Sequence, residues 1–305
     1  MPLIPHIEEE NGRRPAWLRV TSLLAMRVLI TGASGLIGRE VVRAAPPDWE
    51  VVAPGRDDAD LTAPGFSASL PERVDAVMHL AQARRYRDFP ACAPDVLAVN
   101  VHATAELLDY AWRAGAQRFL FTSTATVYRT SHDPIAEDAP LCTRSVYATS
   151  KRAAELLIEP YRETFGCRVL RIFTAFGAVR DDRLVADLVD RVETGRPVTV
   201  QGERGLVTSP IWAPDAAACV VRALQKDVPA GEVDVVNVGG DPMGIRAMAE
   251  AIGRVLGRDP VYEAVPGPEP GGYPADRRKG IERLGFPGGV DFEQAVARAF
   301  ATSDA

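Results

Sequence analysis

The chain has few of the residues that build metal centres or disulfide frameworks. Its 305 residues include four cysteines and four histidines, and none of these forms a CxxC pair or an HExxH-type pair. A zinc site or a disulfide scaffold is therefore not expected, and no other metal site is predicted. The cysteines are expected to be free thiols in the reducing cytoplasm.

The sequence also lacks long apolar runs and an excess of positive charge. No stretch approaches the roughly 20 apolar residues that cross a bilayer, so no membrane contact is expected. The formal net charge is −6, with 35 Lys and Arg against 41 Asp and Glu. Since nucleic-acid binding relies on basic surfaces, a nucleic-acid partner is not expected. A small polar ligand fits this composition better.

The first 25 residues differ from the rest of the chain. Arg13-Arg14 followed by Trp17-Leu18 could suggest a secretion signal. However, Arg19 and Thr21 interrupt the short apolar run, and no small-residue cleavage site follows. We expect residues 1–25 to be a poorly ordered extension, with the fold beginning at Met26.

From Met26 onward, short apolar segments alternate with segments of helical periodicity. Strands are predicted at Val28–Thr31, Trp49–Ala53, Ala76–Leu80, Arg118–Thr122 and Arg168–Ile172. Helices are predicted at Leu36–Ala44, Val101–Trp112, Tyr147–Ile158 and Ile245–Leu256. Apolar strands that alternate with helices predict an α/β fold, a Rossmann-type doubly wound parallel sheet covered by helices on both faces.

A glycine-rich turn joins the first strand to the first helix. Residues 31–38 read TGASGLIG, with glycines at 32, 35 and 38. Gly32 would permit a tight turn, Gly35 would let the backbone approach a pyrophosphate, and Gly38 would let the helix pack against the sheet. The free N–H groups where the helix begins favour phosphate. The turn therefore predicts a dinucleotide site.

The end of the second strand bears on the choice between NAD and NADP. An NAD site usually places an acidic residue about 20 residues after the glycines, where it holds the ribose 2′-hydroxyl. Here the strand ends in Val52-Ala53-Pro54-Gly55-Arg56. Because a guanidinium can bind a 2′-phosphate, we expect NADP in preference to NAD. The alternative is a solvated Arg56, with Asp57 or Asp58 reaching the ribose. Asp60 and Leu61 would lie near the adenine, and Leu80, Ala81 and Gln82 beside the pyrophosphate and ribose.

Tyr147 and Lys151 form a YxxxK pair on one face of a predicted helix. A phenol with its ordinary pKa near 10 is a poor acid or base at neutral pH, but a nearby ammonium lowers that pKa. Tyr147 could then exchange a proton with a substrate oxygen while a nicotinamide exchanges the hydride. The hydroxyl residues 122–124 end a predicted strand, where open α/β sheets bind ligands, and could orient the reacting oxygen.

Taken together, these motifs resemble the extended short-chain dehydrogenase/reductases of the NAD(P)-dependent epimerase/dehydratase family. The resemblance covers about residues 26–300. It rests on TGASGLIG at 31–38, HLA at 79–81, FTSTATVY at 121–128 and YATSK at 147–151.

The resemblance implies a site and a class of substrate. Members of this family usually oxidise or reduce a ring carbon, often C4, of a nucleotide-linked sugar, and a homodimer is a common assembly. The implied catalytic residues are Thr124, Tyr147 and Lys151. The implied cofactor residues are Gly32, Ser34, Gly35, Leu36, Ile37, Gly38, Thr122, Tyr147, Lys151 and Phe173, besides Arg56 and the others given above. The implied substrate residues are Arg84, Thr124, Thr126 and Thr174.

Three departures from the family pattern narrow the expected reaction. Ala125-Thr126 stands where dehydratases carry an Asp-Glu pair, which disfavours loss of water. Thr174 stands where many relatives have Asn. The arginine that many relatives place before the block at 209–211 is replaced by Gly205–Thr208, with Arg204 further back. Arg84 could face the substrate crevice or lie in a solvated basic loop.

The expected function is an NADPH-dependent ketoreductase acting on a sugar or nucleotide-sugar carbonyl. One alternative is a 4-epimerase that keeps NAD tightly bound, and another is a regulator that binds the cofactor without catalysis. Residues 26–175 are expected to bind the cofactor. Because the pattern loosens after about residue 175, residues 176–305 are expected to form mainly a smaller substrate-binding region.

Overall fold

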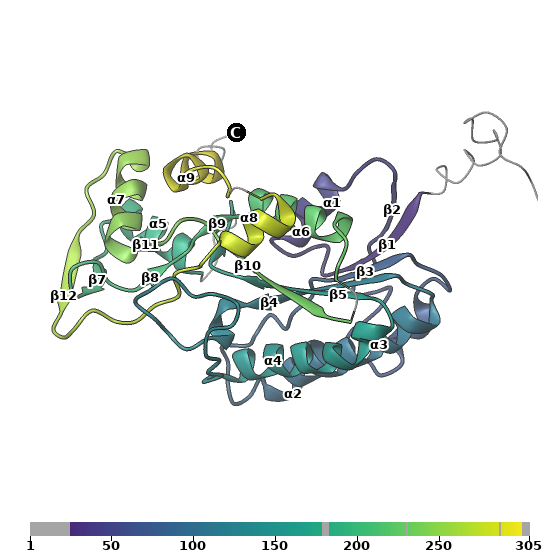
Figure 1. Cartoon of the computed structure of the whole chain (residues 1–305). Helices are drawn as coiled ribbons and strands as arrows, with labels where there is room; N and C mark the ends of the chain where they lie inside the picture. The colour runs from purple at the N-terminus through teal and green to yellow at the C-terminus, as the bar shows by residue number, and fades with distance from the viewer. Residues whose placement is uncertain (1–24, 179–182, 230, 287, 301–305) are drawn as a thin grey trace, which may run out of the picture.

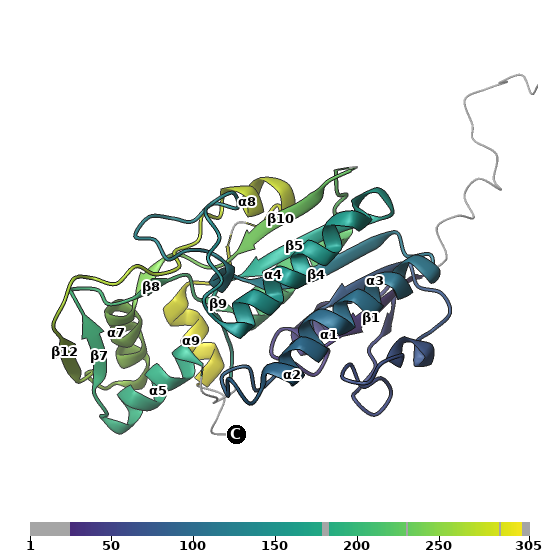
Figure 2. The ribbon, with the colours of Figure 1, turned by 90° about the horizontal axis from the view of Figure 1, so that it is seen from below.

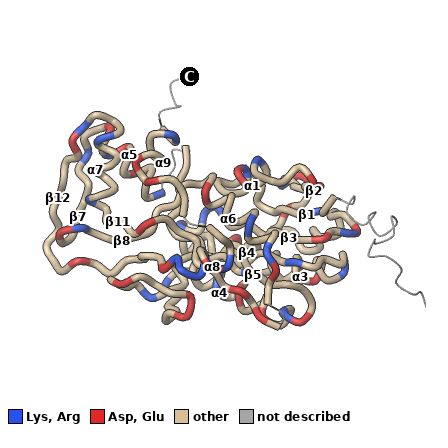
Figure 3. The backbone as a smooth tube through the Cα atoms, turned by 45° about the horizontal axis from the view of Figure 1, so that its top comes forward, with Lys and Arg blue, Asp and Glu red and all other residues tan. Residues whose placement is uncertain are grey.

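The computed structural model describes residues 25–178, 183–229, 231–286 and 288–300. Apart from Ala25, the predicted N-terminal extension lies outside these residues. Acidic and basic residues are interspersed along the described backbone (Figure 3). Within these ranges, no helix is long and apolar enough to cross a membrane.

Six parallel strands form the central sheet, in the order β10-β5-β4-β3-β1-β2. Alternate residues of each strand face opposite layers: Val28 and Ile30 pack on one side, and Leu29 on the other. The strands are β1 (Met26–Thr31), β2 (Trp49–Val52), β3 (Ala76–His79), β4 (Arg118–Thr124), β5 (Gly166–Ile172) and β10 (Val233–Val238).

Helices cover both faces of this sheet (Figures 1 and 2). One layer contains α1 (Gly38–Ala44), α6 (Ala213–Gln225) and α8 (Arg278–Leu284). The opposite layer contains α2 (Ala93–Leu97), α3 (Ala103–Arg113) and α4 (Val146–Ile158). The predicted doubly wound α/β fold is confirmed.

Two element boundaries differ from the sequence prediction in ways that matter for the site. The fourth strand runs on to Thr124, because pairing with β5 continues as far as Thr124 opposite Ile172. The helix predicted from Val101 is instead preceded by α2 and by a π-helical turn, Ala98–His102. That turn presents Asn100 to two neighbouring segments: its Oδ1 accepts from the Ala83 N–H, and its Nδ2 donates to Ser150 Oγ.

A smaller part with its own core lies beyond the sheet (Figure 1). It contains α5 (Leu184–Thr194), β7 (Val198–Gln201), α7 (Ile245–Leu256), β12 (Tyr262–Val265) and α9 (Phe292–Phe300). Short pairs join β6 (Ala175–Phe176) to β9 (Ile211–Trp212), and β8 (Val207–Thr208) to β11 (Met243–Gly244). Since α6, β10 and α8 return to the central sheet, residues 176–305 contribute to both parts.

Candidate active site

The predicted cofactor and catalytic residues gather at the carboxyl ends of β1, β3 and β4. The strand order places β1 between β2 and β3, so the chain leaves β1 on one side and returns on the other. A doubly wound sheet has its ligand crevice at such a switch point. The turn that follows β1 lies at this point.

The glycine turn is folded tightly against the end of β3. Gly32 has a φ of +75°, and a Cβ at this position would lie 2.6 Å from the Ala81 nitrogen. A Cβ on Gly38 would lie 2.1 Å from the Gly32 carbonyl oxygen. Only glycine at position 38 therefore lets the start of α1 approach the turn this closely. The Gly35 N–H donates to that oxygen at 2.9 Å. The first helix therefore begins at Gly38, not at Leu36 as predicted.

The other residues of this turn take different positions. Ser34 is exposed, whereas Leu36 and Ile37 are partly buried. The Leu36 side chain lies against Gly177, at the start of the chain toward the smaller part.

A buried histidine joins the ends of β1 and β3. Thr31 Oγ1 lies 2.7 Å from His79 Nδ1, and His79 Nε2 lies 3.0 Å from Thr104 Oγ1. Because Thr104 donates its proton to the Asn100 carbonyl, Nε2 carries the imidazole proton and Nδ1 accepts from Thr31. Burial, together with the charge of Lys151, lowers the pKa of His79 to about 3.

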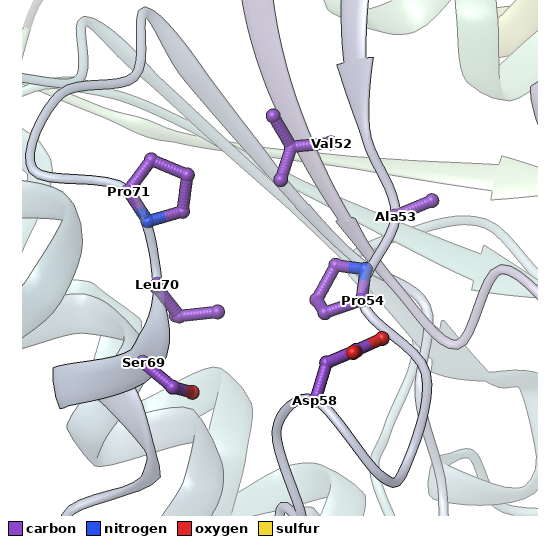
Figure 4. Close-up of a pocket in the computed structure, with 7 residues that line it drawn as sticks. All are labelled: Val52, Ala53, Pro54, Asp58, Ser69, Leu70 and Pro71. Carbon is purple, nitrogen blue, oxygen red and sulfur yellow. The ribbon is translucent and has the colours of Figure 1, made fainter.

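An open pocket of about 430 Å³ lies at the end of β2 (Figure 4). Val52, Pro54, Asp58 and Leu70 contribute to its lining. Asp58 Oδ2 accepts from the Gly55 N–H at 2.9 Å.

The cation predicted to bind a 2′-phosphate is on the surface beside this pocket. The Arg56 side chain is 75% exposed, and its Nε lies 3.8 Å from Asp60 Oδ1. Leu61 packs against the core beneath the pocket, and Leu80 N–H donates to the Thr31 carbonyl at the glycine turn.

Tyr147 is in the first turn of α4, which Ser145 caps by accepting from the Ala148 N–H at 3.1 Å. The phenol donates to Gln82 Oε1 at 2.8 Å. Its ring stacks on Tyr86, with centroids 4.3 Å apart. The sequence prediction assigned Gln82 to the cofactor, and the structure places it against the phenol.

The expected lowering of the phenol pKa by lysine is not observed. Burial and the neighbouring Tyr86 raise the pKa of Tyr147, while the Thr124 hydroxyl and Arg183 act against that rise. Lys151 is itself buried, with its Nζ 4.4 Å from the Phe121 ring centroid. Burial lowers the pKa of Lys151 to about 7, and this lysine is not among the groups that lower the pKa of the phenol.

Two threonine hydroxyls at the end of β4 extend the site from Tyr147. Thr124 Oγ1 lies 3.1 Å from Thr126 Oγ1 and accepts from the Thr126 N–H at 3.2 Å. Thr122, two residues earlier in β4, is buried, and its hydroxyl lies 3.4 Å from the His79 carbonyl oxygen. The hydroxyl cluster therefore continues from the phenol toward the loop after β4.

The remaining predicted residues are spread around this cluster. Phe173 is fully buried, with its ring 6.3 Å from that of Tyr128. Thr174 Oγ1 lies 2.6 Å from Thr208 Oγ1, so it is joined to the segment where the expected arginine is missing. Arg84 is exposed in the loop after β3.

Sequence reasoning missed two neighbours of the phenol, Tyr86 and Arg183. Tyr86 follows Gln82 by four residues in an irregular loop, so no periodicity relates it to Tyr147. Two strands, β5 and β6, lie between Tyr147 and Arg183 along the chain. Neither contact had a signal in the sequence.

The glycine turn is open on one side, as a bound dinucleotide would need and a purely structural turn would not. A Cβ on Gly35 would meet only the Gly32 oxygen, at 3.1 Å, so the turn is open on its other side. The glycine turn would hold the pyrophosphate of a dinucleotide, and the pocket at the end of β2 would take its adenosine. Among the residues that the structure describes, no group of His, Cys, Asp and Glu is arranged to hold a metal ion.

Comparison with known proteins gives relatives whose names include epimerases, dehydratases and a ketoreductase. The Low-salt glycan biosynthesis protein Agl12 of Haloferax volcanii is 28% identical over 70% of this chain and 77% of its own length. The UDP-glucose 4-epimerase of Mycolicibacterium smegmatis is 28% identical over 76% of this chain and 83% of its own.

A solved structure, MoeE5 in complex with UDP-glucose and NAD, has the same fold with a TM-score of 0.75 and 23% identity, over 90% of this chain and 97% of that one. The model of the NAD dependent epimerase/dehydratase family matches residues 28–239. The chain belongs to this family, as its four motifs indicate.

Proposed function

We propose that the protein transfers hydride at a ring carbon, C4, of a sugar or nucleotide-linked sugar. The observation that carries the proposal is the phenol of Tyr147, held at the ligand crevice by Gln82 and adjacent to the Thr124 hydroxyl. A phenol so placed is a proton donor or acceptor for a substrate oxygen. Catalysis by a nicotinamide needs such a group beside it.

The roles of the residues follow from their places. Thr124 and Thr126 orient the substrate oxygen, and Tyr147 gives or takes its proton. Lys151, one helical turn from Tyr147, would bind a ribose hydroxyl of the cofactor. A nicotinamide cofactor whose pyrophosphate is held by the glycine turn would supply or accept the hydride.

Two modes of this reaction are open, and different observations favour each. Arg56 is an exposed guanidinium at the end of β2, suited to a 2′-phosphate, which favours an NADPH-dependent ketoreductase. The name of the M. smegmatis relative and the NAD in the MoeE5 complex favour a 4-epimerase that retains NAD. An epimerase returns the hydride to the opposite face and needs no net supply of reductant.

Cofactor titration separates the two modes. For the ketoreductase we expect calorimetry to give tighter binding of NADPH than of NADH, and Arg56→Gln to remove that difference. A charge-assisted contact contributes about 1.5–3 kcal/mol, which predicts a loss of roughly tenfold or more in NADPH affinity. Tightly retained NAD in the purified protein, with UDP-galactose formed from UDP-glucose, would instead establish the epimerase.

We also propose that the protein is a cytoplasmic homodimer assembled through α3 and α4. These helices lie side by side on one face of the sheet (Figure 2). They expose large apolar side chains there, with Trp112 61% and Leu156 53% exposed. An apolar surface on two helices is suited to an isologous contact with a second copy. The cysteines of the described residues are free, as expected in a reducing compartment.

A further inference from the structure

We infer that a second pocket, beside Thr126, binds a carboxylate carried by the sugar of the substrate. The pocket encloses about 180 Å³, and its lining includes Thr126, Arg129, Arg144, Ser145 and Tyr273. This inference rests on the proposed function, because it assigns one substituent of the substrate to a place next to the reacting carbon. The residues that line this pocket would select an acidic sugar.

The pocket is built by segments that are fixed relative to one another. The Arg129 N–H donates to the Pro140 carbonyl at 2.9 Å, and the Cys142 N–H donates to the Val127 carbonyl at 2.8 Å. The two segments that carry Arg129 and Arg144 are thus paired by their backbones. Tyr273 closes the pocket from a distant part of the chain, with its N–H donating to the Val207 carbonyl at 2.8 Å.

The pocket adjoins the catalytic hydroxyls directly. Thr126, which contributes to its lining, lies 3.1 Å from Thr124 through the two hydroxyl oxygens. Ser145, also in the lining, caps the helix that carries Tyr147 two residues later. A group bound in the pocket would therefore belong to a molecule whose reacting oxygen lies at Thr124 and Tyr147.

The charges around the pocket favour an anion. Its lining contains two arginines and no acidic residue. Within the described parts of the chain, neither Arg129 nor Arg144 forms an ion pair, whereas arginines elsewhere, such as Arg85 and Arg204, are paired with carboxylates. Planar guanidinium groups bind carboxylates through paired hydrogen bonds, and the Thr126 hydroxyl can donate a further one. Because both arginines are exposed, this binding should weaken as salt is added.

The experiment compares two ligands that differ at one carbon. UDP-glucuronate carries a carboxylate where UDP-glucose carries a hydroxymethyl group, and both carry the same diphosphate. Calorimetry is done on the full chain saturated with NAD, at low and high salt. At low salt, we expect the wild-type protein to bind UDP-glucuronate at least tenfold more tightly than UDP-glucose.

Arg129→Gln and Arg144→Gln test the pocket itself. Each is expected to weaken UDP-glucuronate binding about tenfold and to leave UDP-glucose binding unchanged. Arg73→Gln is the matched control, because Arg73 is exposed at the opposite edge of the sheet, before β3. Circular dichroism checks that each variant is folded.

The outcomes distinguish this inference from the proposed function. An equal loss for both ligands would assign the arginines to the diphosphate, and no loss for either would leave the pocket without a part in substrate binding; both results overturn the inference. Turnover of UDP-glucose without preference for UDP-glucuronate overturns the inference alone. Failure to bind or convert either ligand while NAD binds overturns the inference and contradicts a nucleotide-sugar substrate.

Discussion

At the scale of single residues, Tyr147 is the group on which the proposed chemistry depends. Its phenol is held between Gln82, Tyr86 and Thr124, in surroundings that raise its pKa. A proton on the phenol suits the direction in which a ketone is reduced, because the substrate oxygen must then receive one. Charge added when substrate and cofactor bind would tune this group further.

Tyr147→Phe is expected to lower hydride transfer by about 100-fold to 10,000-fold, since it removes the acid and base and keeps the ring. Stacking on Tyr86 is retained, so cofactor affinity measured by calorimetry should change little. Turnover is followed by nicotinamide absorbance with keto-sugar substrates. If the variant kept the cellular function of the wild-type protein, the regulator that binds cofactor without catalysis would be supported instead.

His79 gives a prediction about pH at the same scale. The folded protein keeps this imidazole neutral, with its pKa lowered to about 3 by burial, whereas the unfolded chain protonates it below its ordinary 6.5. The unfolded state therefore binds more protons between these values, and stability falls as the pH falls from 6.5 toward 3. At pH 5 this amounts to about 2 kcal/mol.

Urea unfolding at pH 7.5 and pH 5 measures this effect. His79→Gln can keep a hydrogen bond to Thr31 or Thr104, and is expected to reduce the loss of stability between the two pH values. His132→Gln is the control, because His132 is exposed. An unchanged pH dependence in His79→Gln, equal to that of the control, would show that this imidazole titrates normally.

At the scale of elements, α4 connects the site to the rest of the sheet. Its Ser150 accepts from Asn100 and donates to the Tyr147 carbonyl, and Asn100 also accepts from the loop after β3. One turn after Lys151, Glu155 is buried against β5. It accepts from Arg171 Nε at 3.0 Å and from Arg171 Nη2 at 2.8 Å.

Glu155→Gln is expected to destabilise the protein by about 3–5 kcal/mol, because Arg171 would keep a buried charge without its partner. Although burial opposes the charge of Glu155, its hydrogen bonds and attraction to Arg171 hold its pKa below the ordinary value. The free energy of unfolding in urea is the measurement. Glu159→Gln, just beyond the same helix with a side chain 44% exposed, should cost less than about 1 kcal/mol. Equal effects of the two changes would contradict the importance of the buried pair.

At the scale of the whole molecule, segments from different parts of the chain contribute residues to the candidate site. The sheet presents the glycine turn and Thr124, α4 presents Tyr147, and the loop that carries Tyr273 reaches the hydroxyl cluster from beyond β12. Trp112 on α3 and Leu156, nine residues after Tyr147 on α4, are exposed apolar side chains. We therefore expect that the proposed dimer contact can be altered without replacing a candidate catalytic residue.

Trp112→Asp combined with Leu156→Asp is expected to shift the protein from dimer to monomer in analytical ultracentrifugation, because charge replaces the apolar contact. Val265→Asp is the control, since Val265 is an exposed apolar residue of the smaller part. A wild-type protein that sediments as a monomer at micromolar concentration would exclude the proposed dimer.

The fold was largely predictable from the sequence because its signals are local. Apolar strands, helical periodicity and the glycine spacing each involve residues within about a dozen positions of one another, which is enough to predict the doubly wound sheet and the turn after β1. The expected strand end at Thr122 was two residues short, because the extension to Thr124 depends on pairing with β5.

The sequence by itself determined the family, the alternation of strands with helices, and the candidate residues Thr124, Tyr147 and Lys151. Only the tertiary structure decided the surroundings of those groups. The neighbours of Tyr147 and the pairing of Asn100 with Ser150 join residues as much as 65 positions apart. Burial of Tyr147, which raises the pKa of its phenol, and burial of Lys151, which lowers the pKa of its amine, are properties of the packed layers. Distance and desolvation arise from packing, so no local pattern encodes them.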